Sequence, residues 1–317
     1  MEKAGFIKYL ESKDLSQTSI MLYVKHTEDF FAKTKKEDLQ IVKPDILTYL
    51  EYLKNKKGLQ NSTRSIYLLS LNHYFTYLYQ SEKIAQNPCL FLKIQGKKRK
   101  RLYKIYTSEE LDLLFDNYYQ LFVRGYDDSH YRHEQQKQYS VLGKERNALI
   151  LSILFNQGIT TKEISKIELN DIDLIKASLK IRGGNILNDR ILPLKATQIG
   201  LFMNYLQNIR PQLLEYQATE SNKLFLLVPI PRKKQVKNDN LKGIFYPLTE
   251  QVKTIDKQFI NFLQVRASVI TFWIKTKGLR KAQYLAGHRS ISNTENYLSN
   301  NLDGLINDIN KLHPFDF

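Results

Sequence analysis

The stretch Gly287-His288-Arg289-Ser290-Ile291-Ser292-Asn293-Thr294-Glu295-Asn296-Tyr297 decides how this 317-residue chain is interpreted. It places a histidine nine residues before a tyrosine, after a helical run and a Gly-Leu turn at Gly278 and Leu279. Further upstream, Arg266 precedes an apolar run with helical spacing. An alternative is that Tyr297 is a packing residue, because the chain holds 20 tyrosines.

The composition of the chain favours a nucleic-acid partner. Hydrophobic residues make up 42% of the chain and aromatic residues 12%, which is enough for packed cores, and 317 residues suit about two domains. The formal net charge is +16 and the isoelectric point is about 9.5. A protein with such an excess of positive charge usually binds a polyanion, most often nucleic acid. A merely basic protein without such a partner is the alternative.

Cysteine content and hydropathy predict a cytoplasmic protein that is not membrane-bound. Cys89 is the only cysteine, so neither an internal disulfide nor a thiolate metal cluster is expected. Residues 1–5 lack the pattern of a secretory signal, and no apolar run approaches the ~20 residues that span a bilayer.

The first 90 or so residues predict short amphipathic helices. Ser16 or Thr18 can cap a helix over residues 19–31, and Pro44 suits the first turn of the next helix. A third helix is predicted over residues 62–79, before the stop at Asn87-Pro88.

Beyond residue 92, the pattern predicts a basic linker and then a second domain. Residues 93–104 carry seven basic residues and no acidic residue. Thr107 and Glu110 form a predicted capping box. The polar stretch 126–139 is expected to be an exposed loop, residues 145–169 and 254–310 are expected to be helical, and residues 181–194 predict a β-hairpin.

The C-terminal motif resembles the signature of tyrosine recombinases, the phage-integrase and Xer-like family. The resemblance extends over the helical first domain, the linker and the sequence pattern from Gly158 to Asp173. It implies that Arg266, His288 and Tyr297 are catalytic. In the family the tyrosine attacks a DNA phosphate, and the arginine and histidine stabilise that phosphate. Attack by a phenol requires loss of a proton with an ordinary pKa of ~10, neutralisation of the phosphate charge, and a proton for the departing 5′ oxygen.

The family's other catalytic positions are occupied by unusual residues in this chain. Thr160 occupies the place of the first arginine, and Leu263 that of the histidine in the His-x-x-Arg motif. In the hairpin, Asn185 falls where a lysine is usual, and Asn188 where a second lysine is common. Replacement cations could come from Lys162, Arg182 or Arg190, although a lysine would not reproduce the bidentate contact of an arginine.

Two groups of basic residues are candidate DNA contacts. The linker could strap across phosphates, or it could be only a solvated linker. A second group follows the hairpin, and its members could equally be ordinary surface charges. The candidates are Lys97, Lys98, Arg99, Lys100, Arg101, Arg232, Lys233 and Lys234. Beyond Tyr297, an apolar stripe over residues 302–312 suits a helix that docks on a neighbouring protomer or folds back on its own domain.

We therefore predict a mainly α (α+β) protein: a helical, SAM-like core-binding domain over residues 1–92, a basic linker over 93–105, and a mostly helical catalytic domain with a small antiparallel sheet over 106–317. The predicted function is a site-specific recombinase or integrase of a mobile element. It would break and rejoin double-stranded DNA through a covalent 3′-phosphotyrosine, as a homo-oligomer (a tetramer) on DNA, with no cofactor and no metal. Alternatives are a catalytically decayed DNA-binding accessory protein of the same fold and a helical transcription regulator of other ancestry.

Overall fold

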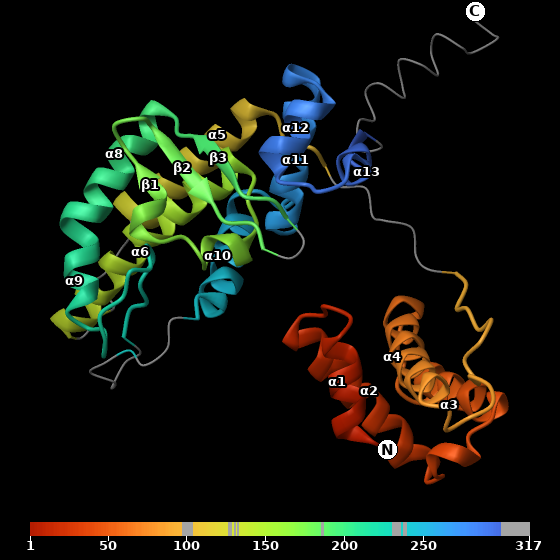
Figure 1. Cartoon of the computed structure of the whole chain (residues 1–317). Helices are drawn as coiled ribbons and strands as arrows, with labels where there is room; N and C mark the ends of the chain where they lie inside the picture. Colours follow the sequence, from red (N-terminus) through yellow and green to blue (C-terminus); the bar gives the residue numbers. More distant parts are fainter. Residues whose placement is uncertain are drawn as a thin grey trace, which may run out of the picture. The chain divides into compact units, whose positions relative to one another are not determined.

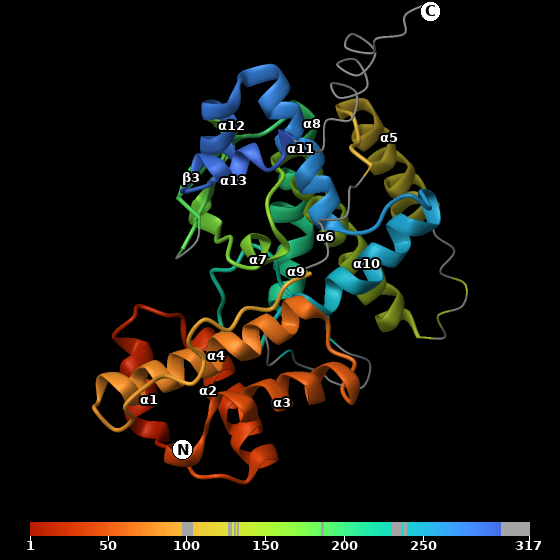
Figure 2. The same cartoon turned by 90° about the vertical axis from the view of Figure 1, so that its right-hand side faces the viewer.

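The chain forms two compact units, Met1–Arg101 and Leu102–Phe317. The computed structural model describes residues 1–96, 104–125, 129, 131, 133–184, 187–229, 236 and 240–298. The division between the units falls inside the stretch 93–105 that the sequence predicts as a linker. Both units are drawn in Figures 1 and 2.

The first unit is helical and has its own core. Its helices are α1 (Lys3–Glu11), α2 (Gln17–Thr34), α3 (Lys43–Asn55) and α4 (Asn61–Gln80), with a 3-10 turn η1 (Asp38–Gln40) before α3. Ser16 caps α2 by accepting a hydrogen bond from the N–H of Ser19, and Pro44 lies in the first turn of α3, both as predicted. The largest fully buried side chains of this core are aromatic and include Phe30, Tyr74 and Phe75.

The second unit consists of helices and a small sheet that buries one of its faces. The helices are α5 (Ser108–Tyr119), α6 (Glu134–Gln157), α7 (Thr161–Ile164), α8 (Ala196–Asn204), α9 (Arg210–Leu214), α10 (Lys242–Ile255), α11 (Phe262–Lys277), α12 (Leu279–Ala286) and α13 (Ile291–Glu295). Two π-helical segments, η2 (Gln120–Arg124) and η4 (Tyr205–Ile209), and a 3-10 turn, η3 (Leu169–Asp171), join some of them.

The sheet is antiparallel and runs in the order β1-β2-β3. Its strands are β1 (Ile172–Asp173), β2 (Ser178–Ile181) and β3 (Arg190–Pro193). β2 pairs with β3 so that Lys180 lies opposite Ile191. Leu179, Ile181 and Leu192 are buried on the inner face. The predicted hairpin therefore exists, although its first strand begins at Ser178. The prediction of a mainly helical protein with a small antiparallel sheet is confirmed.

Two predicted boundaries around α6 are wrong. The expected loop over 126–139 ends earlier, because α6 begins at Glu134; residues 126–128, 130 and 132 lie outside the described residues. The helix expected over 145–169 ends at Gln157, because Gly158 adopts a left-handed conformation with φ of 53°. A side chain at Gly158 would meet Val269 at 2.9 Å, so the close approach of α6 to α11 also requires glycine. Thr160 then caps the separate helix α7.

Packing gathers α7, β3 and the last helices of the described chain at one place. α12 contacts both α11 and β3, and α13 contacts α12, as both views show (Figures 1 and 2).

The capping box predicted for Thr107 and Glu110 is present at the start of α5. In the part of the chain that the structure describes, none of the helices is long and apolar enough to cross a membrane.

Candidate active site

Arg266 enters the interior of the second unit on helix α11. Asn261 fixes the start of this helix by accepting hydrogen bonds from the N–H groups of Leu263 and Gln264, at 3.0 and 3.2 Å. The following turns are buried on almost every side, so the helix carries the Arg266 guanidinium into a protein core. Arg266 is only 4% exposed.

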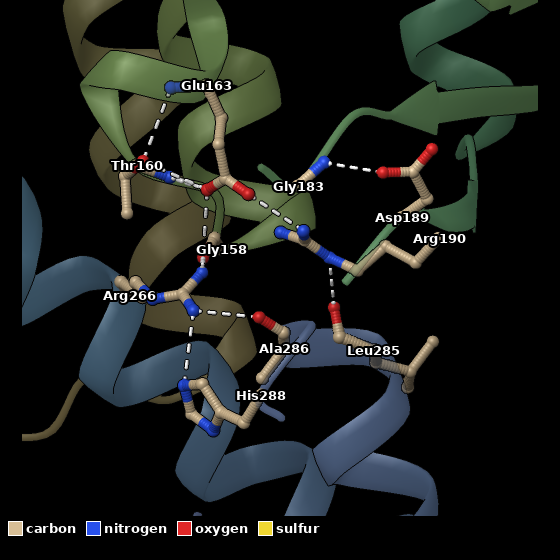
Figure 3. A network of polar contacts seen from close by, with 10 residues as sticks. All are labelled: Gly158, Thr160, Glu163, Gly183, Asp189, Arg190, Arg266, Leu285, Ala286 and His288. Carbon is tan, nitrogen blue, oxygen red and sulfur yellow. Dashed lines mark hydrogen bonds and ion pairs between the residues drawn. The ribbon is translucent and has the colours of Figure 1, made fainter. Parts of the chain in front are cut away.

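Three neighbours orient the Arg266 guanidinium. Nη1 donates to the carbonyl oxygen of Gly158 at 2.7 Å, and Nη2 donates to that of Ala286 at 2.8 Å. Nη2 also lies 3.2 Å from Nε2 of His288 (Figure 3). Burial lowers the pKa of Arg266, and the nearby Glu163 carboxylate and Tyr297 phenol oppose that shift. An arginine remains protonated in such a setting, so the site holds a fixed positive charge.

His288 is held as a neutral imidazole. A guanidinium can only donate, so Nε2 accepts from Arg266 and the ring proton sits on Nδ1. Nδ1 then donates to Oγ1 of Thr294 at 2.9 Å. Burial, together with the charges of Arg266 and Arg190, lowers the pKa of His288 to about 4. In this arrangement His288 positions Arg266 and carries no charge at neutral pH.

Tyr297 lies directly beside this pair. Its ring stacks on the ring of His288, with centroids 5.7 Å apart and planes inclined by 13°. Its backbone N–H donates to the carbonyl oxygen of Thr294 at 3.0 Å, which ties the tyrosine to the end of α13. Tyr297 is half-buried against the core, and its hydroxyl acts on the pKa of Arg266. The structure thus brings Arg266, His288 and Tyr297 together.

Glu163 connects Arg266 to a second buried arginine. Its Oε1 accepts from Nη1 of Arg190 at 2.7 Å, and its Oε2 lies 3.9 Å from Nη1 of Arg266. Burial alone would raise the pKa of Glu163, but the hydrogen bond and charge of Arg190, the N–H of Thr160 and the charge of Arg266 hold it below its ordinary value of 4.5. The carboxylate is therefore ionised at neutral pH.

Two of the four unusual family positions, Thr160 and Asn188, contact residues in or beside this cluster. Thr160 is the N-cap of α7, and both its N–H and its hydroxyl donate to Oε2 of Glu163, at 2.8 and 2.9 Å. Leu263 is exposed at the start of α11. The N–H of Asn188 donates to the carbonyl oxygen of Gly287 at 2.8 Å, which joins the hairpin to the turn before His288. Asn185 lies outside the described residues.

The three candidate replacement cations have different surroundings. Lys162 is exposed on the first turn of α7. Arg182 forms ion pairs with Glu168 at 2.8 Å and with Asp171 at 3.1 Å. Arg190 is buried within the cluster around Glu163. The candidate DNA contacts Lys97, Lys98, Arg99, Lys100, Arg101, Arg232, Lys233 and Lys234 all lie outside the described residues.

The sequence did not indicate two parts of this site. Thr294, which orients His288, carries no pattern that separates it from any other threonine. The pairing of Glu163 with Arg190 joins residues 27 positions apart in sequence, so only tertiary structure reveals it. Among the described residues, no group of three or more His, Cys, Asp or Glu side chains is placed to hold a metal ion.

Comparison with known proteins identifies the family. The sequence model of the phage integrase family matches residues 133–303, more than half of the chain, so this chain belongs to the phage integrase family. The chain is 27% identical over 327 residues to the tyrosine recombinase XerC of Natranaerobius thermophilus, covering 99% of this chain and 98% of that protein. It is 32% identical over 177 residues to the tyrosine recombinase XerD of Staphylococcus saprophyticus, covering 53% of this chain and 55% of that protein.

Solved structures share the fold at lower identity. The Tn1549 transposon integrase in complex with circular intermediate DNA superposes with a TM-score of 0.62 at 13% identity, covering 93% of this chain and 94% of that one. The XerH site-specific recombinase, bound to a palindromic difH substrate in a post-cleavage complex, gives a TM-score of 0.62 at 17% identity, covering 91% of this chain and 78% of that one. The resemblance inferred from the C-terminal motif is confirmed.

Proposed function

We propose that this protein is a site-specific DNA recombinase that breaks and rejoins strands through a covalent 3′-phosphotyrosine intermediate. The observation that carries the proposal is the buried cluster in which Arg266 donates to His288 and the ring of Tyr297 stacks on that histidine. Membership of the phage integrase family and curated relatives named as tyrosine recombinases support the same activity.

The chemistry assigns a role in strand cleavage to Tyr297 and another to Arg266, which His288 positions. The Tyr297 hydroxyl loses its proton as its oxygen attacks the phosphorus and forms the phosphotyrosine ester. The bond from phosphorus to the 5′ oxygen breaks, and that oxygen takes up a proton to become a 5′ hydroxyl. The fixed charge of Arg266 offsets the negative charge that develops on the phosphate oxygens. Attack by a 5′ hydroxyl on the ester reverses the step, so rejoining requires no ATP.

A suicide substrate tests the activity. A pool of random-sequence DNA duplexes first yields a duplex that the protein binds, and a nick is then placed at successive phosphates of that duplex. Cleavage next to the nick releases a short 5′-hydroxyl fragment, which diffuses away and leaves the covalent adduct trapped. The wild-type protein should form an adduct that Tyr297→Phe does not form.

Tyr284→Phe is the matched control. Tyr284 is an exposed tyrosine on α12, so its loss should leave the adduct intact. Binding of the selected duplex without any adduct would contradict recombinase activity and would indicate the DNA-binding accessory role. Absence of any selected duplex would contradict both.

The DNA contacts and the assembly belong to the same proposal. We assign residues 1–92 and 106–317 to two DNA-binding domains and the linker 93–105 to a strap across phosphates, because the net charge of +16 favours binding to a polyanion. Replacing the five basic residues 97–101 by alanine should reduce the magnitude of the slope of log affinity against log salt concentration by up to about 4.5. An unchanged slope would exclude the strap.

Assembly as a homo-tetramer on DNA in the cytoplasm completes the proposal. The mass of the complex with the selected duplex, measured by mass photometry, should correspond to four protein chains. A complex that never exceeds one chain per duplex would contradict it. Cell fractionation should recover the protein in the cytoplasmic fraction, together with nucleic acid.

A further inference from the structure

Arg190 on strand β3 is a buried arginine with an unused hydrogen-bond donor. It is 2% exposed. Its Nε donates to the carbonyl oxygen of Leu285 at 2.8 Å, and its Nη1 donates to Glu163 at 2.7 Å. Nη2 is buried and has no hydrogen-bond partner in the described part of the chain. A buried donor without a partner is uncommon in folded proteins and calls for a ligand or a functional role.

The charges around Arg190 do not balance. Arg190 and Arg266 both lie against Glu163, which is the only carboxylate among the described residues that forms an ion pair with either of them (Figure 3). His288 is neutral because burial, together with the charges of these two arginines, lowers its pKa to about 4. The buried cluster therefore carries one uncompensated positive charge, and an anion with several acceptor oxygens would complement it.

Position 160 supplies no guanidinium in this chain. In the family that position holds the first phosphate-binding arginine. In this chain the Thr160 side chain caps α7 and donates to Oε2 of Glu163, while Oε1 receives Arg190. Figure 3 shows the guanidinium groups of Arg190 and Arg266 both directed at this carboxylate. Arg182 is engaged with Glu168 and Asp171 instead.

We propose that Arg190 supplies the second guanidinium contact to the phosphate that Tyr297 attacks, in place of the arginine absent at position 160. The inference rests on the proposed recombinase function. Nη2 of Arg190 donates to a non-bridging phosphate oxygen, and Arg266 offsets the charge on the phosphate from the opposite side of Glu163. Because Nη2 is enclosed, a phosphate reaches it only when neighbouring side chains shift. Arg190 therefore contributes more to cleavage than to initial DNA affinity.

A neutral phosphate tests this contact directly. The wild-type adduct identifies the attacked phosphate, and a second substrate carries a methylphosphonate at that phosphate, which removes one negative oxygen. On the ordinary substrate, Arg190→Ala should slow adduct formation by about 100- to 1000-fold. On the methylphosphonate, the same variant should stay within about 10-fold of wild type, because less charge has to be neutralised. DNA affinity should change little.

Control variants separate this role from a structural one. Arg182→Ala removes an arginine of the same hairpin and should affect both substrates by the same factor. If Arg190→Ala fails to fold, Arg190→Lys takes its place, because a lysine can retain the ion pair with Glu163. Arg190→Lys should likewise lose less rate, relative to wild type, on the methylphosphonate than on the ordinary substrate. Thr160→Arg, combined with Arg190→Ala, should restore part of the lost rate on the ordinary substrate.

The outcomes are distinguishable. An equal loss on both substrates in Arg190→Ala and Arg190→Lys would overturn the inference and leave Arg190 as a positioning residue, with the recombinase function intact. Absence of any Tyr297-dependent adduct in the wild-type protein would overturn the proposed function and the inference together.

Discussion

Replacing Glu163 by glutamine should strongly destabilise the second unit. Glu163 is 4% exposed. Its Oε1 lies 2.7 Å from Nη1 of Arg190, whose side chain is fully buried. Removing one partner of a buried ion pair costs about 3–5 kcal/mol, because the other charge stays buried without compensation. A domain is stable by only about 5–15 kcal/mol in total. Glu163→Gln should therefore remove about a fifth or more of the stability of this unit.

The single tryptophan makes this loss measurable in one unit alone. Trp273 is buried in the core of the second unit, so its fluorescence follows unfolding of that unit and not of the first. In urea, where m is about 1–3 kcal/mol/M, the midpoint of Glu163→Gln should fall by more than about 1 M. Glu168→Gln is the matched control, because its partners Arg182 and Lys223 are partly exposed; its midpoint should change much less.

The pH dependence of the same variant gives an independent check. The folded state lowers the pKa of Glu163 below 4.5, so its stabilisation is present above that pH and is lost as the pH falls through the lowered value. The difference between wild type and Glu163→Gln should narrow below about pH 4.5. A loss of less than about 1 kcal/mol at neutral pH, or one no larger than that of Glu168→Gln, would refute the reasoning that Glu163 holds two buried arginines together.

Three further predictions concern neighbouring positions. Gly287→Ala should lower the free energy of unfolding by more than the ~1–2 kcal/mol that a left-handed residue costs, because φ is 73° and a Cβ would also lie 2.6 Å from Nη1 of Arg190. In an Arg190→Ala background the loss beyond ~1–2 kcal/mol should disappear, and its persistence there would contradict the clash. The pKa of His288 is lowered to about 4 in the folded state, so the free energy of unfolding should fall more steeply in wild type than in His288→Asn as the pH drops from 6.5 to 4. Unfolding followed by Trp273 fluorescence at a series of pH values measures this, and equal dependence on pH in the two proteins would contradict a buried neutral histidine. Thr160→Ala should cost about 1 kcal/mol through loss of the α7 cap, and a cost near zero would show that Glu163 holds the helix start alone.

Local sequence patterns predicted the elements that depend on local contacts. The Ser16 cap, Pro44 in the first turn of α3 and the capping box of Thr107 were all correct, because each depends on residues within one helical turn. The predicted C-terminal end of α6 was wrong for the opposite reason. Gly158 ends that helix where α6 approaches Val269, more than 100 positions away in the chain, so the requirement for glycine comes from tertiary packing.

The sequence by itself determined the family and the order of Arg266, His288 and Tyr297, since the spacing from Gly287 to Tyr297 is a property of one continuous segment. The sequence alone could not predict which basic side chain lies near Arg266, because Lys162, Arg182 and Arg190 are all basic and all close in sequence to the expected site. Only tertiary structure decided that Arg182 pairs with Glu168 while Arg190 is buried against Glu163. The physical reason is that a charge acts through distance and burial, and neither can be counted along the chain.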